Sequence, residues 1–128
     1  MKLTPKKIES IQALPAPKRY SHFIKVAADQ RQVWGLYSSG WAMIGTDDGR
    51  NGFPLWPAAE YAQLCAVEEW KDYSPRSIDL DTLMRILVPR LKESGDCIAI
   101  FPTPAQKGIL PDIDVMESDI QNELNRIE

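Results

Sequence analysis

The sequence holds little of what metal-binding and reactive sites need. Among its 128 residues there is one histidine and there are two cysteines, Cys65 and Cys97, with no Cys-x-x-Cys or Cys/His clustering between them. The sequence therefore contains no zinc-binding or redox motif, and His22 is the only residue available for a mechanism that uses an imidazole. We expect no metal and no cofactor, two buried thiols and a solvent-facing His22.

Long apolar runs are also missing. No stretch approaches the roughly 18 residues that a membrane helix needs, and the start of the chain lacks the continuous apolar segment of a signal peptide. The glycines match neither Gly-x-Gly-x-x-Gly nor Gly-x4-Gly-Lys-Ser/Thr, and residues 47–51 lack the alternating oxygen ligands of an EF-hand loop. We expect a cytoplasmic protein whose glycines serve turns.

What is present suits one ordinary globular domain. The sequence is 44% apolar and 26% charged, as is usual for soluble proteins, and second cores appear only in longer chains. We expect residues 1–128 to fold as a single domain, with the N-terminal helix and connector, residues 1–16, at its periphery.

Helical signals recur along the chain. Thr4 before Pro5 is typical of a helix start, and Pro89 is expected to kink or end the helix in which it lies. The expected helices cover residues 5–14, a second helix from Pro17 with Tyr20, Phe23, Ile24, Ala27 and Ala28 on its buried face, residues 57 to about 70, a helix from the Asp79 cap to Gly95 at the latest, and a last helix capped by Asp114 and Glu117.

Strand signals lie between the helices. The expected strands are a hairpin of residues 33–37 and 41–45, an edge strand over 53–56 because of Pro54, a central strand over 97–101 and an edge strand within 106–110, while residues 71–77 are expected to be a polar connector. Together these patterns predict an α+β fold: a mostly antiparallel, or mixed, sheet of four to five strands with about five helices packed on it in one layered domain.

The four tryptophans are the most informative residues. Trp34, Trp41, Trp56 and Trp70 all fall in one window of 37 residues. They are compatible with a core, with an interface patch or with a small-molecule pocket. The candidate residues for contact with a ligand or partner are Arg19, Trp34, Trp41, Trp56, Tyr61, Arg76 and Phe101; none is a candidate catalytic group.

Charge is unevenly distributed along the chain. Residues 1–31 contain seven Lys/Arg against two acids, whereas residues 111–128 contain six Asp/Glu against one arginine. The cations are spread over two expected helices and the whole chain carries a net charge of −3, which argues against nucleic acid as a partner. We expect the two ends to attract each other, within one molecule or between two copies.

Several short motifs occur together in a fixed order. They are Arg19-Tyr20-x-x-Phe23, Val33-Trp34-Gly35-Leu36, Gly40-Trp41, Trp56-Pro57-x-x-x-Tyr61-Ala62, Trp70 and Phe101-Pro102-Thr103-Pro104 with Gly108. In this set the chain resembles the small bacterial family called domain of unknown function 2750, from about residue 19 to residue 110. The resemblance implies a compact bacterial single-domain protein and supplies no activity, cofactor or catalytic residue.

These observations favour a non-enzymatic role. Large aromatic side chains are plentiful while no set of catalytic residues is evident, so the sequence predicts an interaction module that binds a protein partner or a second copy of itself. The alternative is a small-ligand-binding protein or enzyme with an aromatic pocket around Trp34, Trp41 and Trp56. Nucleic-acid binding through the N-terminal lysines is a third, weaker hypothesis.

Overall fold

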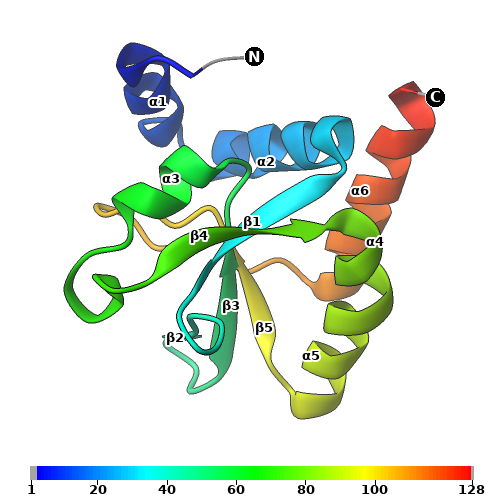
Figure 1. Ribbon diagram of the computed structural model, residues 1–128. Coiled ribbons are helices and arrows are strands. Elements are labelled where there is room, and N and C mark those ends of the chain that lie inside the picture. The colour runs from blue at the N-terminus through cyan, green and yellow to red at the C-terminus, as the bar shows by residue number, and fades with distance from the viewer. Residues whose placement is uncertain (1–2, 128) are drawn as a thin grey trace.

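The computed structural model describes residues 3–127, which form an α+β fold (Figure 1). The strands are β1 Gln32–Tyr37, β2 Ile44–Gly45, β3 Asn51–Leu55, β4 Ser74–Asp79 and β5 Cys97–Ile100. The helices are α1 Pro5–Gln12, α2 Ala16–Gln30, α3 Ala59–Leu64, α4 Leu80–Thr82, α5 Val88–Ser94 and α6 Ile113–Ile127, with a 3-10 turn η1 Glu68–Trp70 and a π-helical segment η2 Leu83–Leu87. None of the helices within residues 3–127 has both the length and the apolar character that a membrane-spanning helix needs.

The strands form two small sheets, where the sequence predicted one sheet of four to five strands. One sheet is the antiparallel pair β1–β4, and the other has the order β2-β3-β5. In Figure 1 the β1–β4 pair lies across the ends of β3 and β5. Within the described residues one bridge joins the sheets, in which the amides of Trp34 and Trp56 each donate to the other residue's carbonyl, at 2.9 and 2.8 Å.

The predicted hairpin of residues 33–37 and 41–45 is wrong. β1 pairs along its whole length with β4, and the chain after it returns only at the bridge between Tyr37 and Trp41. β2 pairs instead with the start of β3. The segment expected to be a polar connector thus contains a strand, which the side-chain pattern hides because Ile78 is the only buried residue of β4.

β3 occupies the middle of its sheet although Pro54 predicted an edge. Proline is tolerated there because β2 pairs only with Asn51 and Gly52, so no ladder bond from Pro54 toward β2 is required. On the other side β3 runs parallel to β5, which confirms that the sheet is mixed. β5 is fully buried, but it is the outer strand of its sheet and not the central strand that the sequence predicted. Within residues 3–127 its far side carries only the isolated Ile100–Ile109 bridge.

The local signals for helix starts and ends are largely confirmed. The Thr4 hydroxyl accepts from the Lys7 amide at 3.1 Å, the Asp79 carboxylate caps α4, and Gly95 ends α5 with a φ of 75°. The helical region that contains Pro89 continues through it. The π-helical segment ends just before α5, and Pro89 lies in the first turn of α5, where its missing amide removes no hydrogen bond from within that helix.

Two helix boundaries differ from the prediction. α3 ends at Leu64 rather than near residue 70. The helix cannot extend through Glu68, because Glu68 adopts a left-handed φ of 54° that no right-handed α-helix contains. The cap of α6 lies two residues earlier than expected, at Asp112 instead of Asp114, because the Asp112 carboxylate accepts from the amides of Asp114 and Val115, at 2.8 and 3.2 Å.

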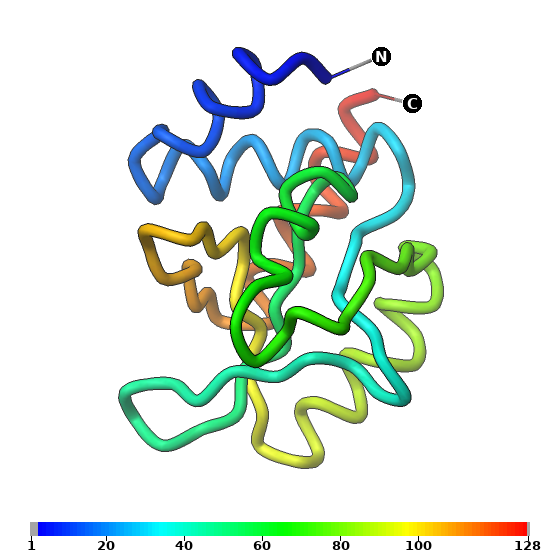
Figure 2. The backbone as a smooth tube through the Cα atoms, turned by 60° about the vertical axis from the view of Figure 1, so that its left-hand side comes forward, coloured from blue at the N-terminus to red at the C-terminus, as the bar shows by residue number. Residues whose placement is uncertain are grey.

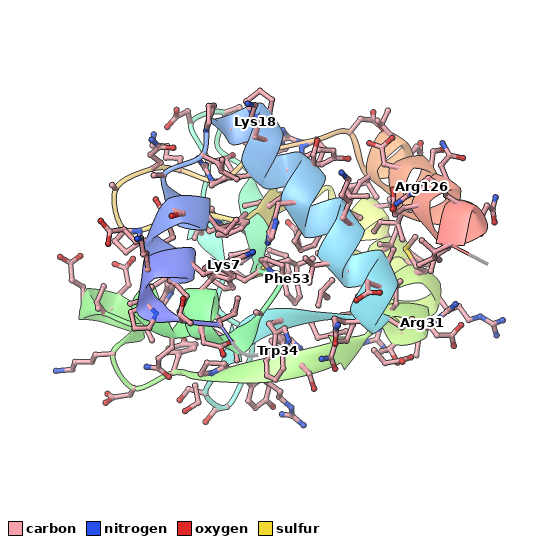
Figure 3. All side chains as sticks on the ribbon, turned by 90° about the horizontal axis from the view of Figure 1, so that it is seen from above. Lys7, Lys18, Arg31, Trp34, Phe53 and Arg126 are labelled. Atoms are coloured by element: carbon pink, nitrogen blue, oxygen red, sulfur yellow. The ribbon has the colours of Figure 1, made fainter. Side chains whose placement is uncertain are left out.

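The oppositely charged ends of the chain meet within one molecule. α2 packs on α6, and the Tyr20 hydroxyl donates to Asp119 at 2.6 Å. A hydrogen bond from Arg126 and, more weakly, the charge of Lys25 lower the pKa of Glu123. Figure 3 shows the cations spread out: Lys18 lies near one end of α2, Arg31 at the other, and Arg126 on α6.

Candidate functional site

A groove of about 650 Å³ lies between three connecting segments on the described part of the surface. They are residues 44–48 around the β2–β3 turn, residues 65–70 between α3 and β4, and residues 102–110 after β5. Figure 2 shows the three segments on the same side of the molecule. We call this depression the loop groove.

Apolar side chains and carboxylates share the walls of the loop groove. The apolar residues are Ile44, Cys65, Val67, Trp70, Pro102, Pro104 and Leu110, and the charged ones are Asp47, Asp48, Glu68, Glu69 and Lys107. Val67 and Leu110 are 52% and 42% exposed. Among the described residues Glu68 and Glu69 have no ion-pair partner. The loop groove therefore offers an apolar surface with a net negative rim.

One wall of the loop groove is a tightly held segment, residues 101–108, which we call the corner loop. It begins at Phe101, whose φ of 55° turns the chain away from β5 while its amide still donates to the Leu55 carbonyl at 2.8 Å. The loop closes at Gly108, where a Cβ atom would lie 3.0 Å from the Ile100 carbonyl oxygen. This contact is tighter than most Cβ atoms make, and the neighbour is a backbone atom, so a side chain here would require the backbone to shift by a few tenths of an ångström.

Arg19 ties the corner loop to α2. Its guanidinium is fully buried and donates to the carbonyls of Leu14, Phe101 and Lys107, at 3.0, 3.2 and 3.2 Å, and to the Gln106 side chain. Burial lowers the pKa of Arg19, but arginine keeps its proton throughout the ordinary pH range. The buried charge is therefore satisfied by neutral oxygens.

Trp56 and Cys65 hold the corner loop from the other side. The Trp56 indole nitrogen donates to the Pro102 carbonyl at 2.8 Å, and the Cys65 thiol approaches the same oxygen at 3.5 Å. Trp70, whose ring meets Trp56 edge-on at 6.5 Å between centroids, lines the loop groove. Burial raises the pKa of Cys65 to about 11, so the thiol stays protonated and is a poor nucleophile at neutral pH.

The Cys65 thiol is expected to make stability depend on alkaline pH. Its ordinary pKa of 9.0 rises to about 11 in the fold, so above pH 9 the unfolded chain loses this proton before the native protein does. The free energy of unfolding should fall by about 2 to 3 kcal/mol between pH 8 and 11 from this group. Urea unfolding at stepped pH measures it, and Cys65→Val should flatten the decline between pH 8 and 10. An equal decline in both proteins would contradict the assignment.

The structure brings four of the predicted contact residues together. Arg19, Trp56 and Tyr61 contact the corner loop, to which Phe101 itself belongs, and the Tyr61 ring lies 4.8 Å from the Phe101 ring. Burial, and then the charge of Glu60, raise the pKa of Tyr61 to about 12, and the Tyr61 hydroxyl has no hydrogen-bond partner among the described residues. These four residues lie behind the loop groove rather than in its lining.

Two other predicted contact residues form a separate cluster. The Arg76 guanidinium lies 4.3 Å from the Tyr37 ring centroid and 5.9 Å from that of Trp41. Trp41 packs on Phe53 and covers Gly35, where a Cβ atom would lie 2.9 Å from the indole. Trp34, the remaining candidate, is half-buried on β1 opposite Ser77 of β4 and is labelled in Figure 3.

His22 is half-buried, not solvent-facing as predicted. Its ring lies 6.4 Å from that of Phe101, and burial, followed by the charges of Lys7 and Lys25, lowers its pKa. His22 is absent from the lining of the loop groove. In residues 3–127 no group of His, Cys, Asp and Glu side chains is arranged to hold a metal ion.

Sequence reasoning missed the residues that line the loop groove. Asp47 belongs to a segment expected to be an exposed turn, Glu68 was expected at the end of a helix, and Lys107 was expected in a short edge strand. A signal for Arg19 was present: it stands four and eight residues before Phe23 and Ala27, which places it on the buried face of α2.

Comparisons with known proteins agree with the motif pattern. No curated protein and no solved structure gave a significant match to the chain. A family model described as "Protein of unknown function (DUF2750)" matches residues 20–120, which include Trp56, Tyr61, Phe101 and Gly108. The ordered motifs and the family match lead to one conclusion: this chain belongs to the DUF2750 family.

Proposed function

We propose that the protein is a non-enzymatic interaction module. In this proposal the loop groove binds an extended segment of a partner protein that carries apolar side chains flanked by lysine or arginine. The observation behind it is the combination of an exposed apolar lining with a rim of carboxylates, opposite a loop fixed by Arg19 and Trp56.

The apolar lining supports a protein partner. Val67 and Leu110 are large apolar residues left exposed within one depression, and such patches are characteristic of binding surfaces. The half-buried Trp70 lines the same groove, and tryptophan is enriched among the residues that dominate binding energy. A partner that covers these side chains would remove their apolar area from water.

The charges support a basic partner. Four carboxylates line the loop groove against one lysine, and opposite potentials favour encounter and suppress wrong partners. Asp48 is already engaged by Arg50 at 2.7 Å, whereas Glu68 and Glu69 have no cation beside them among the described residues. Lysine or arginine at either end of an apolar segment would complement them.

A rigid corner loop supports binding with little reorganisation. Its carbonyls at Phe101, Pro102 and Lys107 are each fixed by a buried or partly buried side chain. A preformed wall lowers the entropy lost on association. Bacterial origin, a cytoplasmic location and self-association belong to the same proposal; a homodimer would show as a concentration-dependent mass in sedimentation.

The alternative function is small-ligand binding. The volume of the loop groove lies within the range of about 300 to 1,000 Å³ that is usual for such sites. Of the rings first considered for an aromatic pocket, Trp34, Trp41 and Trp56 are not in its lining. The protonated Cys65 and the absence of His22 from the groove favour binding over catalysis.

Val67→Lys tests the loop groove directly. The probe is a fluorescein-labelled peptide of sequence Gly-Lys-Leu-Pro-Leu-Lys-Gly, measured by fluorescence polarisation at low ionic strength, with a counterpart carrying Glu for Lys. A lysine at this apolar position should weaken binding of the first peptide about tenfold or more, because it removes apolar contact and adds a like charge. The Glu peptide should bind neither protein.

Val115→Lys is the matched control. Val115 is 53% exposed, nearly the same as Val67, and lies on α6 outside the loop groove. It should leave the affinity within about twofold of the unmodified protein. Equal binding by both variants would place the peptide elsewhere, and no binding by the unmodified protein would overturn the proposed function.

A further inference from the structure

An ion pair spans the loop groove from one wall to another. Lys107 of the corner loop contacts Asp47 of the β2–β3 turn, with 2.8 Å between the ammonium and carboxylate. The two residues are 60 positions apart in the chain, and both line the groove. Among the ion pairs of the described residues this one alone joins two of its walls.

The backbones of both partners are held in place, whereas their side chains are exposed to solvent. The Lys107 carbonyl accepts from the buried Arg19 at 3.2 Å. The turn that carries Asp47 is closed by the Thr46 amide, which donates to the Arg50 carbonyl at 2.9 Å. The side chains of Lys107 and Asp47 are nevertheless 82% and 87% exposed. Their positions are thus fixed while their contact is open to exchange.

Such a contact is easily replaced. An ion pair between two solvent-exposed side chains contributes little net stability, since both charges remain well hydrated and screened. A ligand ammonium or guanidinium that reaches Asp47 exchanges one such pair for another. The ligand's apolar contacts with the groove then decide whether the ligand displaces Lys107 from Asp47.

We propose that Lys107 is an internal competitor that occupies Asp47 until a basic segment displaces it. This inference rests on the proposed function and adds two statements to it. Asp47 is the residue that binds the partner's cation, and Lys107 limits access to Asp47. Asp48 is held by Arg50 within its own turn, whereas the cation on Asp47 comes from the opposite wall.

The competitor also makes the site selective. An apolar segment without a cation would leave Lys107 on Asp47 and would have to bind with the pair still in place. A segment with a correctly placed lysine or arginine releases Lys107 to solvent. Neutralising Lys107 should therefore favour the basic peptide over an uncharged one, which a simple apolar groove would not do.

Lys107→Gln is the central variant of the test. With the peptide Gly-Lys-Leu-Pro-Leu-Lys-Gly at low ionic strength, its affinity should exceed that of the unmodified protein by about three- to tenfold, as expected for loss of one competing charge. With Gln in place of both peptide lysines, the variant should show no gain. Asp47→Asn should weaken binding of the lysine peptide by a similar factor.

Two controls separate competition from general electrostatics. Lys71→Gln removes the same charge from an exposed lysine outside the loop groove and should leave affinity within about twofold. In the Asp47→Asn background, Lys107→Gln should have no further effect, because there is no carboxylate left to release. Thermal melts of all variants should match, since Lys107, Lys71 and Asp47 are exposed.

The outcomes distinguish this inference from the proposed function. Suppose that the unmodified protein binds the lysine peptide and that Lys107→Gln raises the affinity no more than Lys71→Gln does. The inference that Lys107 competes for Asp47 would then be wrong, while the proposed function of the groove would stand. An equal gain from Lys107→Gln with or without Asp47 would also overturn the inference. If the unmodified protein does not bind the peptide, the proposed function fails, and this inference, which rests on it, fails with it.

Discussion

Replacing Arg19 with methionine is expected to lower the free energy of unfolding by about 3 to 5 kcal/mol, a large part of the stability of a domain of this size. Methionine fills a similar volume but donates no hydrogen bond. The carbonyls of Leu14, Phe101 and Lys107 would lose their guanidinium partner in a partly buried place, and each unsatisfied buried acceptor costs about 1 to 3 kcal/mol. Urea unfolding followed by circular dichroism at pH 7 measures the change.

Arg90→Met is the matched control for Arg19. Arg90 is exposed on α5 and has no hydrogen bond or ion pair among the described residues, so the same substitution there should change stability by less than about 0.5 kcal/mol. Arg19→Lys should fall between the two, because one ammonium cannot reach all the acceptors that the planar fork reaches. A loss below about 1 kcal/mol for Arg19→Met would show that the corner loop does not depend on this residue.

Trp56→Phe should have the second-largest effect, a loss of about 2 to 4 kcal/mol. The ring is fully buried, so the smaller side chain leaves a cavity that costs about 1 to 2 kcal/mol. The Pro102 carbonyl also loses the indole donor at 2.8 Å and keeps only the distant Cys65 thiol, which adds about 1 to 2 kcal/mol. The same urea experiment measures the total.

Trp70→Phe provides the comparison for Trp56. Trp70 is only half-buried, and its indole nitrogen makes no hydrogen bond among the described residues. The substitution should therefore lower the free energy of unfolding by less than about 1 kcal/mol while still weakening the binding of the peptide to the loop groove. Similar losses of stability for both variants would mean that the bond to Pro102 contributes little.

The local parts of the fold follow from the sequence. The Thr4 and Asp79 caps, the buried stripe of α2 and the Gly95 stop are decided by residues a few positions apart, and helices are determined by such short-range contacts. The apolar run of β5 likewise predicts a strand buried on both faces.

Strand pairing does not follow from the sequence in the same way. β1 pairs with β4 through backbone hydrogen bonds, which are available to any residue except proline. Because β4 buries only Ile78, its side chains carry no alternation to mark it as a strand. The division into two sheets depends on which strands come together in space, and the nearer segment, residues 41–45, looked like the better partner.

The candidate site divides in the same manner. Local residue patterns were enough to predict that the helices exist, that β5 is buried and which motifs mark the family, because burial and capping depend on residues a few positions apart. Only the tertiary structure brought residues 44–48, 65–70 and 102–110 together as one groove and placed Lys107 against Asp47. Exposed loop residues face no packing constraint that their spacing could reveal, so their meeting depends on the whole chain being folded.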